Sequence, residues 1–464
     1  MLREVFSEDE LQKKAASSGF YKRKCGFTPA MFFDILLCCA SQSETYSLSQ
    51  VSSRVKTQHR VKITKQSIDG RFTEGAVAFV KEILKELLER QLSKVFCADF
   101  LSQFNHVRIK DSTRFTVPDK LSEHFKGSGG SQGTSQASVS IQYEYDARSG
   151  KILDLNVTAG IRNDATDASE TKTKINKGDL VIRDLGYFNL SVLTGFTDQG
   201  ASFISRLNTS ILVYEPDTTE EIGFKELYDR MCEKKQTRCD KQVLVGKGKL
   251  EQSRLIVEIV PEQVYEERIR KVNKQNKEKG WTTSEEYKAR CRFNMFITNV
   301  PNEEFSVEEA MLIYRLRWQV ELMFKNWKSV CKINKIQPMK YERFACLLFA
   351  KLILILLNTQ VICNLQVYYF KKRRLILSEN KCFKTLRESF SILRGIWKEQ
   401  RKMSEKKLKD LASQFSSNHW KEKRKNKMSL IEIIELFICK SKDYAYIEDI
   451  KKGTKSQPRP LIIN

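Results

Sequence analysis

Four residues in one short stretch of the chain have the types and the spacing to act on a phosphate group. Tyr314, Arg317, Glu321 and Lys328 lie in the run YRLRWQVELMFKNWK. On an α-helix, where each residue turns by about 100°, the last three fall at roughly −60°, −20° and −40° from the first. A Glu carboxylate can ligate Mg²⁺, and Arg and Lys side chains can hold a phosphate. The pattern therefore predicts one polar stripe of a single helix that suits a metal ion and a phosphate together.

The same run predicts how this helix would pack. Ser306 can cap it, and its apolar residues fall on a different face, which would contact a core. Those apolar residues are Leu316, Val320, Met323, Phe324 and Trp327. A plainer interpretation of the polar stripe is a solvated helix face with ion pairs such as Arg317 with Glu321. Two acids further upstream favour the first interpretation.

Asp111 and Asp184 each end a run with the alternation of a β-strand, RIKD and VIRD. This is unusual because Asp is a poor strand former. In a β-β-β-α-β-α-β order the first and fourth strands lie side by side, so the two carboxylates would meet at the strand ends. Two carboxylates that close repel each other unless a divalent cation neutralises them. With Glu321 they predict a two-metal site that activates a water or a 3′-hydroxyl, although either Asp alone would be interpreted as a cap.

The elements that would position these residues predict an α/β fold with a mixed sheet at its core. Alternating runs from residue 105 onward predict five strands before an insertion and one after it, with a hairpin turn at 148–150. The sequence patterns predict helices at 1–95 and a helical, basic region at 340–464. We expect a helical DNA-binding domain at 1–95, the first part of the catalytic core at 104–207, a β-rich basic insertion at 208–291, the second part of the core at 292–338, and a helical basic region at 339–464 with a role in dimerisation.

The segment 47–72 has the pattern of two short helices joined by a turn. Ser47 can cap the first helix and Thr64 the second. In a helix-turn-helix, the second helix would carry polar side chains toward a DNA major groove. Those side chains are Lys65, Gln66, Ser67, Asp69 and Arg71. The alternative is an ordinary pair of packed helices.

The charge balance predicts a polyanionic partner. The 464 residues carry a formal net charge of +24, with a pI near 9.4, which favours nucleic acid and leaves an anionic membrane surface as the competitor. The N-terminal residues lack the apolar run of a signal peptide. Twelve Cys without a C-x-x-C pair indicate reduced thiols in a cytosolic protein. We therefore expect a cytoplasmic protein.

One apolar stretch tests the expectation that the protein is soluble. Residues 344–363, FACLLFAKLILILLNTQVIC, are long enough to span a bilayer. Lys351 lies near the middle, where a charge costs roughly 3 kcal/mol on insertion scales. The sequence therefore favours a buried core helix over a membrane span.

At the motif positions the chain resembles DDE transposases of the IS-four insertion-sequence family, which have a ribonuclease-H-like catalytic core. The family's C-terminal motif Y-x(2)-R-x(3)-E-x(6)-K is matched at Tyr314, Arg317, Glu321 and Lys328, with Trp318 directly after the Arg. The surroundings of the two earlier acids also match, at Asp111-Ser112-Thr113 and at Asp184-Leu185-Gly186-Tyr187-Phe188. FISRLN and FITN fit as well, so the resemblance covers roughly residues 45–340.

The resemblance implies Mg²⁺-dependent cut-and-paste transposition by a homodimer in a synaptic complex with double-stranded DNA. The DNA would comprise terminal inverted repeats and a target, and the protein would be a bacterial one that associates with the nucleoid. Asp111, Asp184 and Glu321 would hold two Mg²⁺ ions, for which Mn²⁺ could substitute. Tyr314, Arg317 and Lys328 would grip a phosphate of the terminal strand. Some family members flip a base against a Trp of the insertion, and Trp281 is this insertion's only Trp.

Three other functions remain open from the sequence. A DNA-binding protein with an inactive core would keep the basic charge and the helix pair. A ribonuclease-H-like nuclease would cleave DNA without strand transfer. A membrane protein would be anchored by 344–363.

Overall fold

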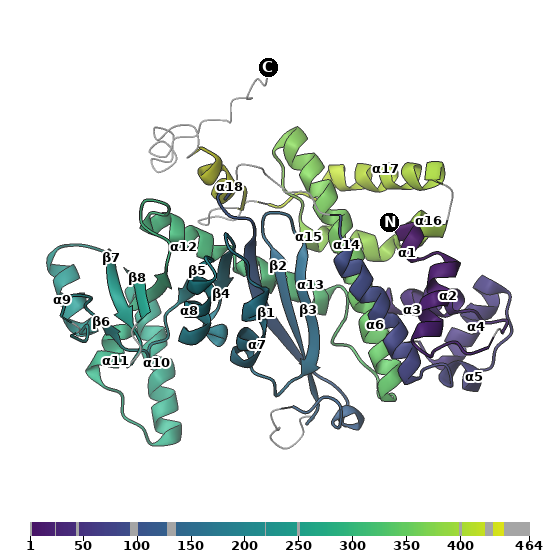
Figure 1. Cartoon of the computed structure of the whole chain (residues 1–464), viewed down its shortest axis with the longest axis horizontal. Helices are drawn as coiled ribbons and strands as arrows, with labels where there is room; N and C mark the ends of the chain where they lie inside the picture. The colour runs from purple at the N-terminus through teal and green to yellow at the C-terminus, as the bar shows by residue number, and fades with distance from the viewer. Residues whose placement is uncertain are drawn as a thin grey trace.

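The computed structural model describes residues 2–23, 25–42, 46–92, 101–127, 136–218, 220–247, 251–398, 401–422 and 430–439. Its centre is one mixed sheet of nine strands in the order β3-β2-β1-β4-β5-β9-β8-β7-β6 (Figure 1). The strands are β1 Val107–Thr116, β2 Ser138–Asp146, β3 Ile152–Ala159, β4 Leu180–Arg183, β5 Ser202–Arg206, β6 Val213–Tyr214, β7 Arg238–Val245, β8 Glu251–Ile259 and β9 Phe293–Thr298. Only the β1–β4 and β4–β5 pairs are parallel, as the order β-β-β-α-β-α-β requires.

The helices form groups around this sheet. Before the sheet come α1 Leu2–Val5, α2 Glu8–Ser17, α3 Pro29–Ala40, α4 Leu48–His59, α5 Lys65–Asp69 and α6 Glu74–Glu89. Along the sheet and its insertion lie α7 Asp164–Thr171, α8 Leu190–Asp198, α9 Phe224–Glu233, α10 Glu262–Lys279, α11 Glu285–Arg290, α12 Val307–Arg315 and α13 Trp318–Ser329. The C-terminal group is α14 Tyr341–Arg373, α15 Glu379–Glu388, α16 Phe390–Lys398, α17 Arg401–Asn418 and α18 Leu430–Cys439.

The two faces of the central strands pack against different helices, as the two-residue period of a strand requires. Ile182 of β4 and Ile204 of β5 belong to the same apolar cluster as Val320 of α13. Their neighbours Val181 and Phe203 belong to a second cluster, which includes side chains of α8. The motif helix therefore covers one face of the sheet, and α8 covers the other.

The insertion differs from the expected β-rich domain. It supplies strands β6, β7 and β8, but also helices α9, α10 and α11. β8 pairs with β9 from Arg254 to Ile259, so the inserted strands extend the central sheet, while the helices lie at the far end of the molecule (Figure 1). The sequence pattern missed α10 because its apolar content is low, and none of its residues is buried.

α14 contains residues 344–363, the apolar stretch that is long enough to span a bilayer. Among the described residues it alone is long and apolar enough to cross a bilayer, yet 67% of its most apolar window is buried inside the molecule. It runs between the sheet and the N-terminal helices (Figure 1). At its start Lys340 donates a hydrogen bond of 2.8 Å to the carbonyl of Asp69, which ends α5. α14 is thus the helix that joins the N-terminal group to the sheet.

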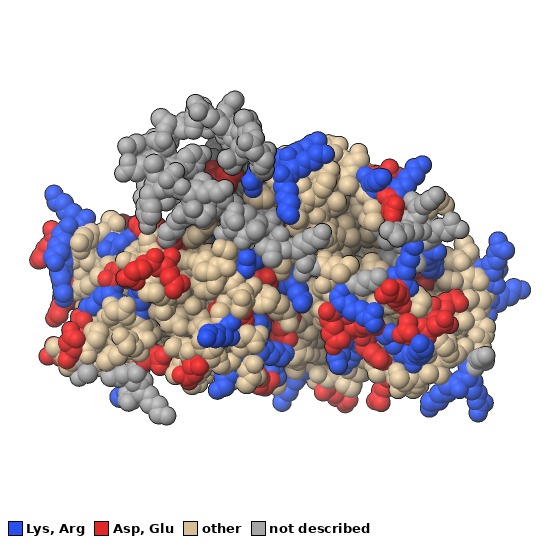
Figure 2. Space-filling view, turned by 45° about the horizontal axis from the view of Figure 1, so that its top comes forward, with Lys and Arg blue, Asp and Glu red and all other residues tan. Residues whose placement is uncertain are grey.

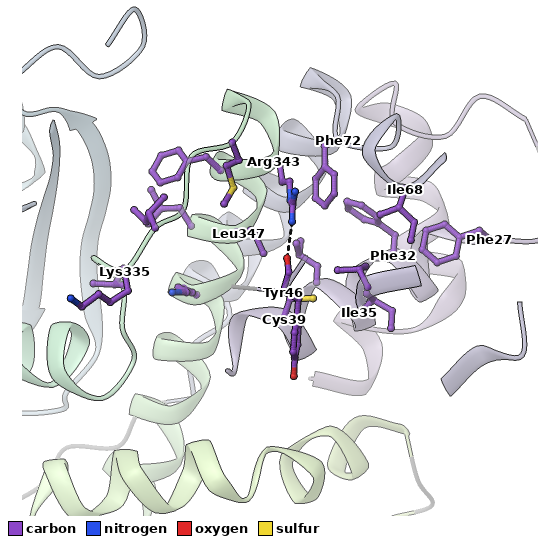
Figure 3. A pocket seen from close by; sticks show the side chains of 18 residues that line it. Phe27, Phe32, Ile35, Cys39, Tyr46, Ile68, Phe72, Lys335, Arg343 and Leu347 are labelled. Atoms are coloured by element: carbon purple, nitrogen blue, oxygen red, sulfur yellow. Dashed lines mark hydrogen bonds between the residues drawn. The ribbon is translucent and has the colours of Figure 1, made fainter. Parts of the chain in front are cut away.

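A small cavity of about 50 Å³ lies where the N-terminal helices meet α14 (Figure 3). Its lining is mostly apolar, with Phe27, Phe32 and Phe72 on one side and Leu347 of α14 on the other. Arg343 closes part of it by donating a hydrogen bond of 2.8 Å to the carbonyl of Tyr46. No side chain of the predicted catalytic or phosphate-binding set lines this cavity.

The basic charge does not form one continuous field on the face shown in Figure 2. There, Lys and Arg side chains alternate with Asp and Glu. The chain's surplus of +24 is therefore mixed with acids on this face.

Candidate active site

β1 and β4 bring the first two acids together. Their parallel register pairs Lys110 with Arg183, so the next residues, Asp111 and Asp184, lie side by side. β4 ends at that point, as expected. β1 does not: it continues to Thr116, because its other edge still pairs with β2. The expectation that a strand ends at Asp111 was wrong, although the meeting of the two carboxylates was right.

The YRLRW segment is two helices rather than one, which corrects the expected single stripe. α12 ends at Arg315 and α13 begins at Trp318. The joint is tight: the N–H of Arg317 donates to the carbonyl of Tyr314 at 3.1 Å, three residues back instead of four. Tyr314 therefore comes from α12, Arg317 from the joint, and Glu321 and Lys328 from α13.

The guanidinium of Arg317 lies between all three acids. Its Nη1 is 3.4 Å from Oδ2 of Asp111 and 3.6 Å from Oδ2 of Asp184, and its Nη2 is 2.6 Å from Oε1 of Glu321. The Arg317 side chain is only 14% exposed. Carboxylates from β1, from the end of β4 and from α13 thus converge on one cation.

The environment of Asp111 disfavours its negative charge. Burial raises the pKa of Asp111 to about 6, and the nearby carboxylates of Asp184 and Glu321 act in the same direction. The N–H of Ser112, which donates to its Oδ1 at 2.8 Å, and the charge of Arg317 oppose that rise. For Arg317, burial would lower the pKa, but the Asp184 charge, with Tyr314 and Glu321, raises it above its usual value.

Tyr314 and Lys328 have different places at this site. The Tyr314 hydroxyl donates to Oδ1 of Asp184 at 3.2 Å, and burial raises its pKa. Lys328 points instead to the edge of β1, where its Nζ donates to the carbonyl of Arg114 at 3.0 Å. Tyr314 therefore contacts the acids directly, whereas the ammonium of Lys328 lies to one side of them.

The residue types at this site fit a divalent metal ion. Three carboxylates are the hard oxygen ligands that Mg²⁺ and Mn²⁺ prefer, and their oxygens already surround a positive charge. Within the described ranges, no group of three His, Cys, Asp or Glu side chains is arranged as a finished metal site. The arrangement thus suits a cation at the place that Arg317 holds.

Comparison with known proteins decides the family. The family model "Transposase DDE domain" matches residues 102–357, which include all three acids. The transposase for insertion sequence element IS231B of Bacillus thuringiensis subsp. berliner is 30% identical over 82% of this chain and 83% of its own length. The transposase for IS1151 of Clostridium perfringens is 28% identical over 95% of this chain and 96% of its own length. The chain belongs to the DDE transposase family.

One solved structure shows a weak similarity to this chain. A piggyBac transposase synaptic complex with hairpin DNA has 10% sequence identity and a TM-score of 0.42, covering 98% of this chain and 88% of that chain. Family membership itself makes this transposase an enzyme that cleaves DNA strands and transfers them, as the IS-four resemblance implied.

The transposase also has supporting residues that the sequence pattern did not single out. The Tyr187 hydroxyl, just after Asp184, bonds to Oε1 of the buried Gln142 and to the side chain of Ser112. Gln142 lies opposite Ser112 in the β1–β2 register and donates to Asp164 at 2.9 Å. Tyr187 thus ties the segment after the second acid to the residue after the first. The polar residue Gln142 within the apolar strand β2 was the signal available in the sequence.

The other candidate DNA contacts of the transposase lie far along the chain from the acids. Ser47 and Thr64 cap α4 and α5 as expected, but α5 has only five residues. Lys65, Gln66 and Ser67 are exposed on it. Arg71 is turned inward, with Nη2 3.2 Å from the sulfur of Cys25. Trp281 follows α10 with 62% of its surface exposed, and the Lys279 ammonium lies 4.5 Å from the centre of its ring.

Proposed function

We propose that Asp111, Asp184 and Glu321 of this transposase hold two Mg²⁺ ions, for which Mn²⁺ can substitute. The supporting observation is that these carboxylates, from three separate elements, converge on a single positive charge. Bound there, the metals would activate a water or a 3′-hydroxyl and stabilise the leaving oxygen of a phosphodiester. The β3-β2-β1-β4-β5 order of the core strands supports a ribonuclease-H-like core for residues 104–207 and 292–338.

The chain's own residues orient the acids and the DNA. Tyr314 holds the Asp184 carboxylate by its hydrogen bond. Arg317 and Lys328 bind a phosphate of the terminal strand, the first with a planar fork and the second as a point charge. Lys328 suits this role because its ammonium lies on β1, at the carbonyl of Arg114, three residues along the strand from Asp111.

The substrate DNA in this proposal comprises the element's terminal inverted repeats and a target. The similar proteins are transposases for insertion sequence elements. Exposed Lys65, Gln66 and Ser67 on α5 read the repeat, and Trp281 at the end of α10 makes a further DNA contact. A homodimer, joined through the helices after residue 339, holds two ends in a synaptic complex.

The decisive experiment replaces the third acid and a matched neighbour. Glu321→Gln should abolish cleavage of a terminal-repeat duplex in Mg²⁺ while DNA binding persists, because the amide keeps the size and removes the charge. Glu308→Gln is the control: Glu308 lies one helix earlier and pairs with Arg238 at 2.8 Å. Near-normal cleavage by Glu321→Gln would remove Glu321 from the metal site.

A joining assay with the same duplex separates transposition from the two rival functions of this fold. Strand transfer into a target plasmid is the expected result. Cleavage without joining would indicate a nuclease, and binding without cleavage would indicate an inactive DNA-binding protein.

A further inference from the structure

Arg317 occupies the position at which the proposed metal site needs its cation. Its guanidinium makes three ion pairs, one with each acid. The other cation of the motif, Lys328, makes none of them and bonds to a backbone carbonyl instead. The two cations of the motif are therefore not equivalent in the DNA-free protein.

A metal ion and this guanidinium would compete for the same oxygens. A divalent ion must contact carboxylate oxygens at about 2.1 Å, whereas Nη2 of Arg317 lies 2.6 Å from Oε1 of Glu321. The carboxylates cannot close around an ion while the guanidinium stands among them. Arg317 also neutralises part of the negative charge that would attract the metal.

We propose that Arg317 is an exchangeable internal counter-cation, which keeps the acid triad from binding metal until a DNA phosphate draws its guanidinium away. This inference rests on the proposed metal function of the triad. It adds that metal loading and the capture of a DNA end are coupled through one side chain. By linkage, a phosphate at Arg317 must then raise metal affinity, and metal must raise the affinity for that phosphate.

The structure shows why Arg317 can make this exchange. It lies at the joint between α12 and α13 instead of inside a helix, and its Nε, within the described part of the chain, has no hydrogen-bond partner. A guanidinium is weakly hydrated and binds phosphate with two parallel hydrogen bonds. A phosphate beside Lys328 would offer Arg317 a replacement for the carboxylates.

The test measures Mn²⁺ affinity by calorimetry on the full chain without DNA. Arg317→Gln should bind Mn²⁺ about tenfold more tightly than the unaltered protein, because the competing charge is gone while a hydrogen-bonding group remains. Arg317→Lys, which keeps the charge but loses the fork, should stay near the unaltered protein. Arg315→Gln is the matched control, because exposed Arg315 on α12 makes the same charge change two residues away.

A second measurement adds a short duplex with a 5′-phosphate end. Mn²⁺ affinity of the unaltered protein should rise, whereas that of Arg317→Gln should change less. Circular dichroism of each variant checks that it is folded, and Arg317→Met, which also removes the charge and should gain Mn²⁺ affinity, replaces Arg317→Gln if that variant is not folded.

The outcomes separate this inference from the proposed function. Equal or weaker Mn²⁺ binding by folded Arg317→Gln would overturn the exchange and leave the metal site standing. A gain of the same size in Arg315→Gln would also overturn it, since it would reflect net charge alone. If no protein binds Mn²⁺, with or without the duplex, the proposed metal site itself fails.

Discussion

Asp111 is the most enclosed of the three acids, with 19% of its side chain exposed against 36% for Asp184 and 32% for Glu321. Its burial on the sheet, between two other carboxylates, is the reason its pKa is raised to about 6. A carboxylate held this way favours its proton in the folded state. The site is therefore arranged for binding a cation at some cost to the stability of the fold.

Asp111→Asn should stabilise the protein at neutral pH. The pKa of Asp111 rises from an ordinary value of 3.8 in the unfolded chain to about 6 in the folded protein, so the cost is absent below pH 3.8, grows between the two values and is complete above 6. The gain at pH 7 should reach up to about 3 kcal/mol, from about 1.4 kcal/mol per pKa unit. Urea unfolding at pH 4, 5, 6 and 7 without metal measures it, and a gain that did not grow with pH would contradict the assignment.

At the scale of elements, β1 carries the proposed metal ligand Asp111 on one face and a buried charge on the other. Asp111 faces α13, while its neighbour Lys110, fully buried, points the opposite way. Nζ of Lys110 lies 2.5 Å from Oδ2 of Asp167 on α7 and 2.9 Å from Oδ2 of Asp154 on β3. The ion pairs of this ammonium hold α7 and β3 against β1, the strand that carries Asp111.

Lys110→Met should destabilise the sheet by about 3 kcal/mol, because it removes the close partner of buried Asp167 and leaves that carboxylate only the longer ion pair with Arg162, at 3.7 Å. Lys174→Met is the matched control. Lys174 pairs with the same Asp154 at 3.1 Å but is 54% exposed, so its loss should cost no more than about 1 kcal/mol. Thermal unfolding followed by circular dichroism compares the two variants. Similar losses of stability would show that the buried ion pairs of Lys110 stabilise the fold no more than the exposed ion pair of Lys174.

The elements also show what the sequence could and could not predict. The sequence could predict that Asp111 and Asp184 are adjacent. The alternation of apolar and polar residues marks each strand, and the order of strands along the chain indicates which strands lie side by side. The break at 316–317 was invisible, because no Gly or Pro marks it and the apolar spacing continues through it. The partner of Lys328 and the inward turn of Arg71 depend on contacts with distant segments, β1 and Cys25, which no local pattern contains.

At the scale of the whole molecule, the charge of +24 should make DNA binding strongly dependent on salt. The affinity for a terminal-repeat duplex should fall by about 10³ or more between 50 and 200 mM salt if six or more phosphates are contacted. Filter binding or fluorescence anisotropy over that range measures the slope. A flat slope would mean that the basic surplus, which is mixed with acids on the face in Figure 2, does not meet phosphates.

The burial of α14 makes a second prediction at this scale. Because most of its apolar window lies inside the molecule, the protein should remain in the supernatant when cell membranes are washed with carbonate. Recovery in the washed membrane pellet, checked against a known cytoplasmic enzyme in the same extract, would support the membrane anchor instead.

The contact between Lys340 and Asp69 has a consequence for DNA sequence. It fixes the end of α5 to the start of α14, a helix of 33 residues and roughly 50 Å, and a short segment joins α14 to the helix that carries Glu321. If α5 reads the repeat and the acid triad cuts the strand, as proposed above, both are attached to one stiff frame, and the protein would set the number of base pairs between the recognised bases and the scissile phosphate. On this proposal the distance from the recognition sequence would define the end of the element, and adding half a helical turn of DNA between the two should place the wrong side of the duplex at the acids.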